Sequence, residues 1–113
     1  MAERYATYEQ FWPFYVSQHR NPTNRQLHFV GTALVLACVA AALIVSPVWL
    51  VVAPVAGYGF AWVGHFFFEK NRPATFIYPL WSLRGDFRMF RLTLLGRMAL
   101  ELERAARLFP VRA

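Results

Sequence analysis

Three histidines and one glutamate are the residues of this sequence whose types and spacing could do chemistry. His19, His28 and His65 are the three histidines of the chain, and Glu69 follows His65 by one helical turn. Imidazole is the commonest protein ligand for iron, zinc, copper and nickel. Two histidines with one carboxylate leave coordination positions open on non-haem Fe(II), where a substrate and O2 can bind. Both the set His28, His65 and Glu69 and the set of three histidines fit this pattern.

Taken alone, each histidine is better interpreted as an amphipathic residue at a helix end near the lipid headgroups than as a metal ligand. The hypothesis of a metal site therefore depends on the three histidines lying together, and on the elements that position them.

An apolar run organises the chain around these residues. From Leu27 to Phe68 the sequence has no Asp, Glu, Lys or Arg. As one helix this run would be roughly 63 Å long, about twice the thickness of a bilayer core. It must therefore fold back, and Ser46-Pro47 near its midpoint is the turn signal. The run predicts a transmembrane hairpin with helices at about 27–46 and 48–68.

The hairpin places the histidines at one level. His28 and His65 stand at nearly equal separations from Pro47, on opposite sides of it. In an antiparallel hairpin both therefore lie at the open end, and His19 lies just outside that end. We expect all three histidines near one membrane interface.

Small residues recur every four positions in the second helix and lead to His65: Ala53, Gly57 and Ala61. Such a stripe lets two membrane helices approach closely. It predicts that His65 faces the first helix rather than lipid.

The flanking segments predict helices that lie at the membrane surface. Thr7 and Gln10 resemble a capping box for a short, bent helix at about 5–18, whose aromatic residues we interpret as an interfacial belt. Residues 76–83 are apolar but too short to span, and residues at about 86–109 follow an amphipathic helical pattern. The fold class predicted is all-α: an integral membrane helical hairpin with interfacial N-terminal and C-terminal amphipathic helices, in one membrane domain over 1–113.

Composition and charge favour a membrane protein over a nucleic-acid-binding one. The chain is 58% hydrophobic, with a net charge of +6, and its mean hydropathy is +0.32. The basic residues flank the apolar run and leave the Ser46-Pro47 turn uncharged, so the positive-inside rule puts both termini in the cytoplasm. The preference for Arg over Lys indicates a GC-rich genome and a bacterial inner membrane. Cys38, the single cysteine, excludes an internal disulfide.

The membrane interface suits a substrate with a polar head and a long alkyl tail, such as a membrane lipid or fatty acid. Its head would lie at the level of the histidines and its tail among the acyl chains. Arg25 or Arg72 could hold a carboxylate head through two parallel hydrogen bonds.

Two motifs in this region resemble a known family. The pattern H-x-N-P-x-N-x-x-x-H runs from His19 to His28, and G-H-x-x-x-E-K-x-R-P-A runs from Gly64 to Ala74. Both are similar to motifs of the membrane 2-hydroxy fatty acid dioxygenases, and the resemblance covers roughly residues 15 to 83. In the eukaryotic enzymes of that family further membrane segments separate the two motifs, and a second histidine commonly stands where this chain has Arg20.

The resemblance implies an Fe(II)-dependent oxidoreductase of lipid metabolism that uses O2 to shorten a 2-hydroxy fatty acid by one carbon, a fatty acid alpha-oxidation. The residues that it implies are the metal ligands His19, His28, His65 and Glu69 and the substrate contacts Asn24, Arg25 and Arg72. The alternative is a non-catalytic membrane module that organises lipid or a partner protein. The large lipid-facing surface of two helices also leaves room for an oligomer.

Overall fold

The computed structural model describes residues 5–110, and every regular element in that range is a helix, as predicted. Their bounds are α1 Tyr8–Ser17, α2 Pro22–Ile44, α3 Trp49–Val63, the π-helix η1 Gly64–Glu69, the 3-10 helix η2 Ala74–Phe76, α4 Pro79–Leu94 and α5 Met98–Leu108. The chain divides into two compact units: residues 21–73 form one, and residues 1–20 with 74–113 form the other. The assignment of a single membrane domain to 1–113 stays a prediction.

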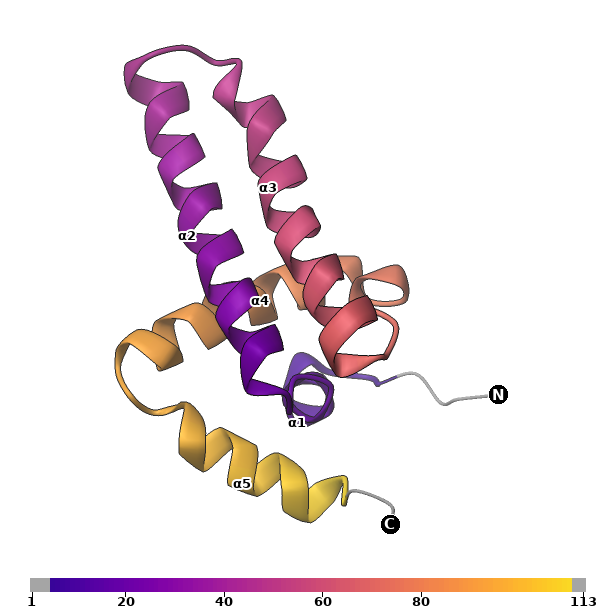
Figure 1. Cartoon of the computed structure of the whole chain (residues 1–113). Coiled ribbons are helices and arrows are strands. Elements are labelled where there is room, and N and C mark those ends of the chain that lie inside the picture. Colours follow the sequence, from indigo (N-terminus) through magenta and orange to yellow (C-terminus); the bar gives the residue numbers. More distant parts are fainter. Residues whose placement is uncertain (1–4, 111–113) are drawn as a thin grey trace. The chain divides into compact units, whose positions relative to one another are not determined.

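The unit of residues 21–73 is a helical hairpin (Figure 1). α2 begins at Pro22 because the Asn21 side-chain oxygen accepts the Thr23 N–H at 2.8 Å and the Asn24 N–H at 3.4 Å. Proline suits the first helical position, since it has no N–H to leave unpaired there. α2 ends at Ile44, and α3 starts at Trp49 after the Ser46-Pro47 turn. The predicted hairpin and turn are confirmed.

α2 and α3 pack closely along part of the predicted small-residue stripe. Ala53 is buried, and a side-chain carbon at Gly57 would lie 2.8 Å from Val35 Cγ2.

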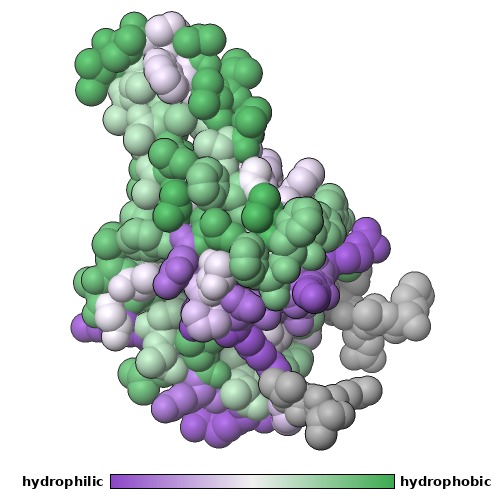
Figure 2. Space-filling view, in the orientation of Figure 1, coloured by the Kyte–Doolittle hydropathy of each residue, from purple (hydrophilic) through white to green (hydrophobic). Residues whose placement is uncertain are grey.

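The outward faces of the two helices expose apolar side chains: Leu43 is 84% exposed and Ile44 is 83% exposed. Figure 2 shows apolar side chains covering the turn end of this hairpin. Two spans are long and apolar enough to cross a membrane, Pro22–Ile44 and Trp49–Glu69.

The second unit has an aromatic core supplied mainly by α1. Residues of α1 pack against residues of η2, α4 and α5; its buried aromatic members are Tyr8, Phe11, Trp12 and Tyr15. Their interpretation as an interfacial belt was wrong, because they are at most 4% exposed and so form the inside of this unit. The N-cap at Thr7 is confirmed, because Thr7 Oγ1 accepts the Gln10 N–H at 3.2 Å. Gln10 Oε1 accepts the Ala6 N–H at 3.1 Å, and not the Thr7 N–H as in a full capping box.

The C-terminal region contains two helices where one was predicted at about 86–109. α4 begins at Pro79, inside the apolar segment that we predicted to be separate, and α5 begins at Met98. The break lies at Gly96, whose φ of 69° is readily reached only without a side chain. The Arg97 N–H donates to the Leu92 carbonyl at 2.9 Å and the Gly96 N–H to the Thr93 carbonyl at 3.2 Å. This is a Schellman motif, which ends α4.

Candidate metal centre

His28 and His65 face each other within the hairpin. His28 lies in the second turn of α2, and His65 is the second residue of η1. Their ring centroids are 4.8 Å apart with the ring planes at 86°. The side chains are 4% and 2% exposed. Because their rings are in contact, the two residues lie at the same level of the hairpin, as predicted.

His19 follows α1 by two residues and is 1% exposed. Its ring stacks on the Tyr15 ring at a centroid distance of 4.2 Å. Only Arg20 and Asn21 separate His19 from the start of α2. The chain therefore carries this imidazole directly to the N-terminal end of α2.

In all three imidazoles the ring nitrogen Nδ1 forms a hydrogen bond. His19 Nδ1 donates to the Tyr15 carbonyl at 2.6 Å, His28 Nδ1 to the Asn24 carbonyl at 3.0 Å, and His65 Nδ1 to Asn71 Oδ1 at 2.7 Å. Each partner is an oxygen that can only accept, so in the neutral ring the hydrogen is on Nδ1. The lone pair then lies on Nε2, which is the arrangement of a metal-binding histidine oriented by an outer partner.

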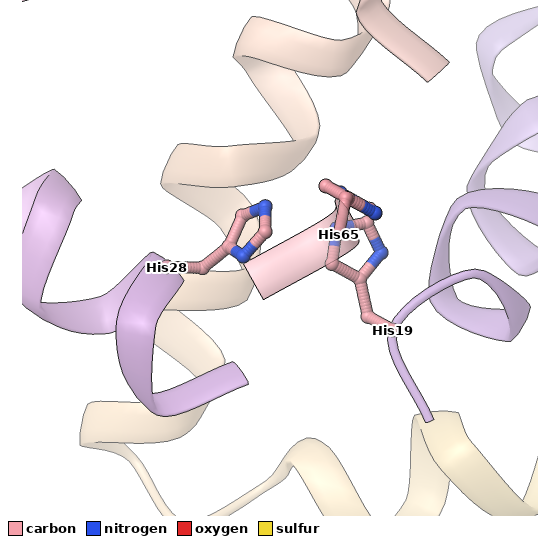
Figure 3. A group of neighbouring side chains, drawn as sticks. All are labelled: His19, His28 and His65. Atoms are coloured by element: carbon pink, nitrogen blue, oxygen red, sulfur yellow. The ribbon is translucent and has the colours of Figure 1, made fainter. Parts of the chain in front are cut away.

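The three histidines form a group that could hold a metal ion (Figure 3). All three are buried, and one ring nitrogen from each lies within 4.8 Å of the others. Nitrogen ligands bind such metals at about 2.0–2.1 Å, so three nitrogens around one ion lie roughly 3.0–3.6 Å apart. Binding one ion would therefore take a movement of the rings toward one another of about an ångström. With this movement, a group of three imidazoles fits a transition metal in donor type and in spacing.

Glu69 lies outside this group. Glu69 Oε1 accepts the Asn21 N–H at 2.9 Å and the Asn24 side-chain N–H at 3.0 Å, so it links the end of η1 to the start of α2. In an α-helix the spacing of four residues predicts that His65 and Glu69 project from one face. η1 is a π-helix, whose wider turn brings residues five apart together, and the two side chains consequently have different partners. The role of Glu69 as a ligand stays a prediction.

The predicted substrate contacts lie at the same end of the hairpin. Asn24 is fully buried, and its amide group is engaged by Glu69. Arg25 is half-buried and Arg72 is exposed. Their contacts with substrate likewise stay predictions.

Sequence reasoning missed two residues that orient histidines, Asn71 and Tyr15. Asn71 fixes the ring of His65 from six residues away, a spacing that places no two residues on one face of an α-helix. Lys70, in the left-handed conformation with φ of 60°, turns the chain back so that Asn71 can reach His65. Tyr15 supports His19 with its ring and its carbonyl group; its position one turn before His19 was the only available signal.

Tyr15 is held in turn by a buried carboxyl group, which predicts a pH-dependent stability. The Tyr15 hydroxyl donates to Asp86 Oδ1, and burial raises the pKa of Asp86 from 3.8 to about 7 although this hydrogen bond acts against the rise. Between about pH 4 and 7 the folded chain therefore binds a proton that the unfolded chain lacks. The unfolding free energy should fall as pH rises through this window, by at most about 1.4 kcal/mol per pH unit.

Asp86→Asn should remove this slope, because the amide mimics the protonated acid at every pH. Melting temperatures from circular dichroism at pH 5 and pH 8 provide the test. The wild type should melt at a lower temperature at pH 8 than at pH 5, and the variant should lose most of this difference. Equal pH dependence in both proteins would show that Asp86 is ionised in the folded state.

A comparison with known protein families finds one family model that matches this chain. The family model described as "2-hydroxy-palmitic acid dioxygenase Mpo1-like" matches residues 5–98, which is more than four fifths of the chain. The matched range includes all three histidines. No curated protein and no solved structure gave a match.

Proposed function

The chain belongs to the Mpo1-like family, and from this premise we propose that it is an Fe(II)-dependent membrane dioxygenase. Its substrates would be 2-hydroxy fatty acids or similar lipids, which it would shorten by one carbon with O2, releasing the carboxyl carbon as CO2 together with one water. One observation supports the proposal most: three buried imidazoles lie together, each with Nδ1 engaged by an oxygen acceptor.

In this proposal His19, His28 and His65 hold the metal through Nε2. Fe(II) held by these residues would supply one-electron and O2 chemistry. Tyr15, Asn24 and Asn71 would keep the rings oriented, because each of them accepts the hydrogen on Nδ1 of one histidine. Because the three histidines are almost fully buried, the surrounding protein also excludes bulk water from the site.

The hairpin would span the membrane through α2 and through α3 with η1. In the most apolar window of these two spans only 22% and 17% of residues are buried, whereas the core helix of a soluble protein is mostly buried. Each large apolar side chain left in water forgoes about 1.5–3 kcal/mol of burial free energy, and a bilayer removes this cost. The charge pattern favours a cytoplasmic position for both termini, and the preference for Arg over Lys favours a bacterial inner membrane.

The substrate carboxylate would bind to Arg25 or Arg72, at the end of the hairpin that carries the histidines. A guanidinium group can donate two parallel hydrogen bonds to one carboxylate, which fixes the head of the fatty acid. Asn24, whose carbonyl group already orients His28, would contribute to the same region. The alkyl tail would then lie along the exposed apolar surface of the hairpin.

Glu69→Gln distinguishes a metal ligand from a structural link at this position. Gln keeps an oxygen that can accept from the Asn21 N–H and the Asn24 side chain, but it is a poor ligand for Fe(II). If Glu69 serves only as a link between η1 and α2, the variant should keep its iron content within about twofold of the wild type. A loss of iron with unchanged helical content would add Glu69 to the ligand set.

The proposed reaction is tested with purified protein, Fe(II), O2 and 2-hydroxypalmitic acid. Mass spectrometry should find a fatty acid one carbon shorter, formed with consumption of O2. Palmitic acid and 3-hydroxypalmitic acid are the matched controls and should not be shortened, because neither carries a hydroxyl group next to the carboxylate. Stoichiometric iron without turnover of any of these acids would contradict the reaction and favour the non-catalytic membrane module.

A further inference from the structure

α4 exposes apolar side chains on the face opposite to its core contacts. Its buried residues Ser82, Gly85 and Met89 lie on one face. At about 100° per residue, the opposite face carries large apolar residues that are 37% to 78% exposed: Leu80, Leu83, Phe87 and Leu94. A helix that is apolar on both faces buries one of them in its own unit and leaves the other for a different apolar medium.

A row of arginines runs beside this exposed apolar face. Arg84, Arg88 and Arg91 are spaced by four and three residues, so they lie on one side of α4 and extend over roughly 10 Å. Together with α1 they border a surface cleft of about 570 Å³, which is lined by Tyr8, Glu9, Arg84, Phe87, Arg88 and Arg91. Three positive groups against one carboxylate favour an anionic ligand.

Aromatic rings of α1 hold two of these arginines in place. The Arg84 guanidinium lies 3.9 Å from the Tyr8 ring centroid, and the Arg88 guanidinium lies 4.2 Å from that of Trp12. Stacking on a ring engages the face of a guanidinium and leaves the N–H groups at its edge able to bind an anion. Arg88 approaches Glu101 only to 3.9 Å.

Hydrogen-bonding capacity remains unused in this cleft. Within residues 5–110, neither Arg84 nor Arg91 forms an ion pair.

We propose that the cleft between α1 and α4 binds the phosphate group of an anionic membrane lipid, while the exposed apolar face of α4 enters the acyl region. A phosphate diester carries one negative charge on two non-bridging oxygens, and these oxygens accept hydrogen bonds from guanidinium groups. The apolar face beside the arginines favours a lipid over a free anion. This site is separate from the histidine group and does not depend on the proposed dioxygenase function.

The test is native mass spectrometry of the full chain in a neutral detergent, titrated with phosphatidylglycerol or with phosphatidylcholine. Phosphatidylglycerol should bind more tightly to the wild type. Arg84→Gln/Arg91→Gln should weaken its binding about 30-fold, the change that corresponds to about 1 kcal/mol for each basic residue near a lipid surface. Arg104→Gln/Arg107→Gln, which removes the same charge from α5, should weaken it less than threefold.

Equal losses in the two double variants would overturn the proposal, because they would reduce binding to a net-charge effect. Equal affinity for the two lipids would overturn it as well. If inorganic phosphate alone displaces phosphatidylglycerol at comparable concentration, the cleft is a site for a free anion and not for a lipid. Arg84→Lys/Arg91→Lys, which retains the charge and removes the planar fork, should fall between wild type and the Gln variant. Iron content should be unchanged in every variant, which keeps this test independent of the histidine site.

Discussion

His65→Ala is expected to lower metal affinity by more than 100-fold while the hairpin stays folded. His65 is one of three buried imidazoles. Its removal leaves only two protein ligands, which would have to bind the ion in competition with water. Changes in outer partners alone typically cost 10- to 100-fold in metal affinity, so the loss of a direct ligand should cost more. Iron content after anaerobic purification, with helical content from circular dichroism, measures both parts of this expectation.

Phe66→Ala is the matched control for this variant. Phe66 is the next residue in η1 but is 47% exposed and has no place in the histidine group. It should keep wild-type iron content. Wild-type iron in His65→Ala would remove His65 from the site, and loss of iron in both variants would trace the effect to η1 as a whole.

Asn71→Leu should weaken metal binding by about 10- to 100-fold without removing any ligand. The substitution preserves most of the side-chain volume but deletes the oxygen that accepts the hydrogen from His65 Nδ1. The ring is then free to rotate or to change its tautomer, so Nε2 is no longer directed at the metal. Metal affinity is measured by competition with a chelator of known affinity.

Asn71→Asp separates this orienting role from a structural one. Aspartate retains an acceptor oxygen at the same position, and its charge strengthens the bond to Nδ1–H. This variant should bind metal at least as tightly as the wild type. Equal weakening in the Leu and Asp variants would mean that the amide group of Asn71 serves the fold rather than His65.

The hairpin and the convergence of its two histidines were predictable from the sequence. An uncharged run of this length has to fold back on itself, Ser46-Pro47 supplies the break, and nearly equal spacing from that break sets His28 and His65 at one level. The signals involved are local composition and counting along a helix, which do not depend on tertiary packing. The same is true of the helix cap at Thr7.

Features that depend on backbone irregularity or on packing were not predictable. The π-helical turn from Gly64 separates Glu69 from His65, and no propensity in the sequence indicates such a turn. Gly96 ends α4 in a region where the apolar periodicity runs on without interruption. The aromatic residues of α1 have the composition of an interfacial belt; their burial depends on the packing of α1 with α4 and α5, which only the structure shows.

Metal content of protein purified anaerobically in mild detergent, beside a variant without His19, His28 and His65, tests the central claim most directly. The account predicts near-stoichiometric iron in the wild type and none in the variant. Another metal bound to the wild type alone would keep the site but contradict the iron chemistry. Absence of metal from both proteins, or equal amounts in both, would contradict the metal centre itself.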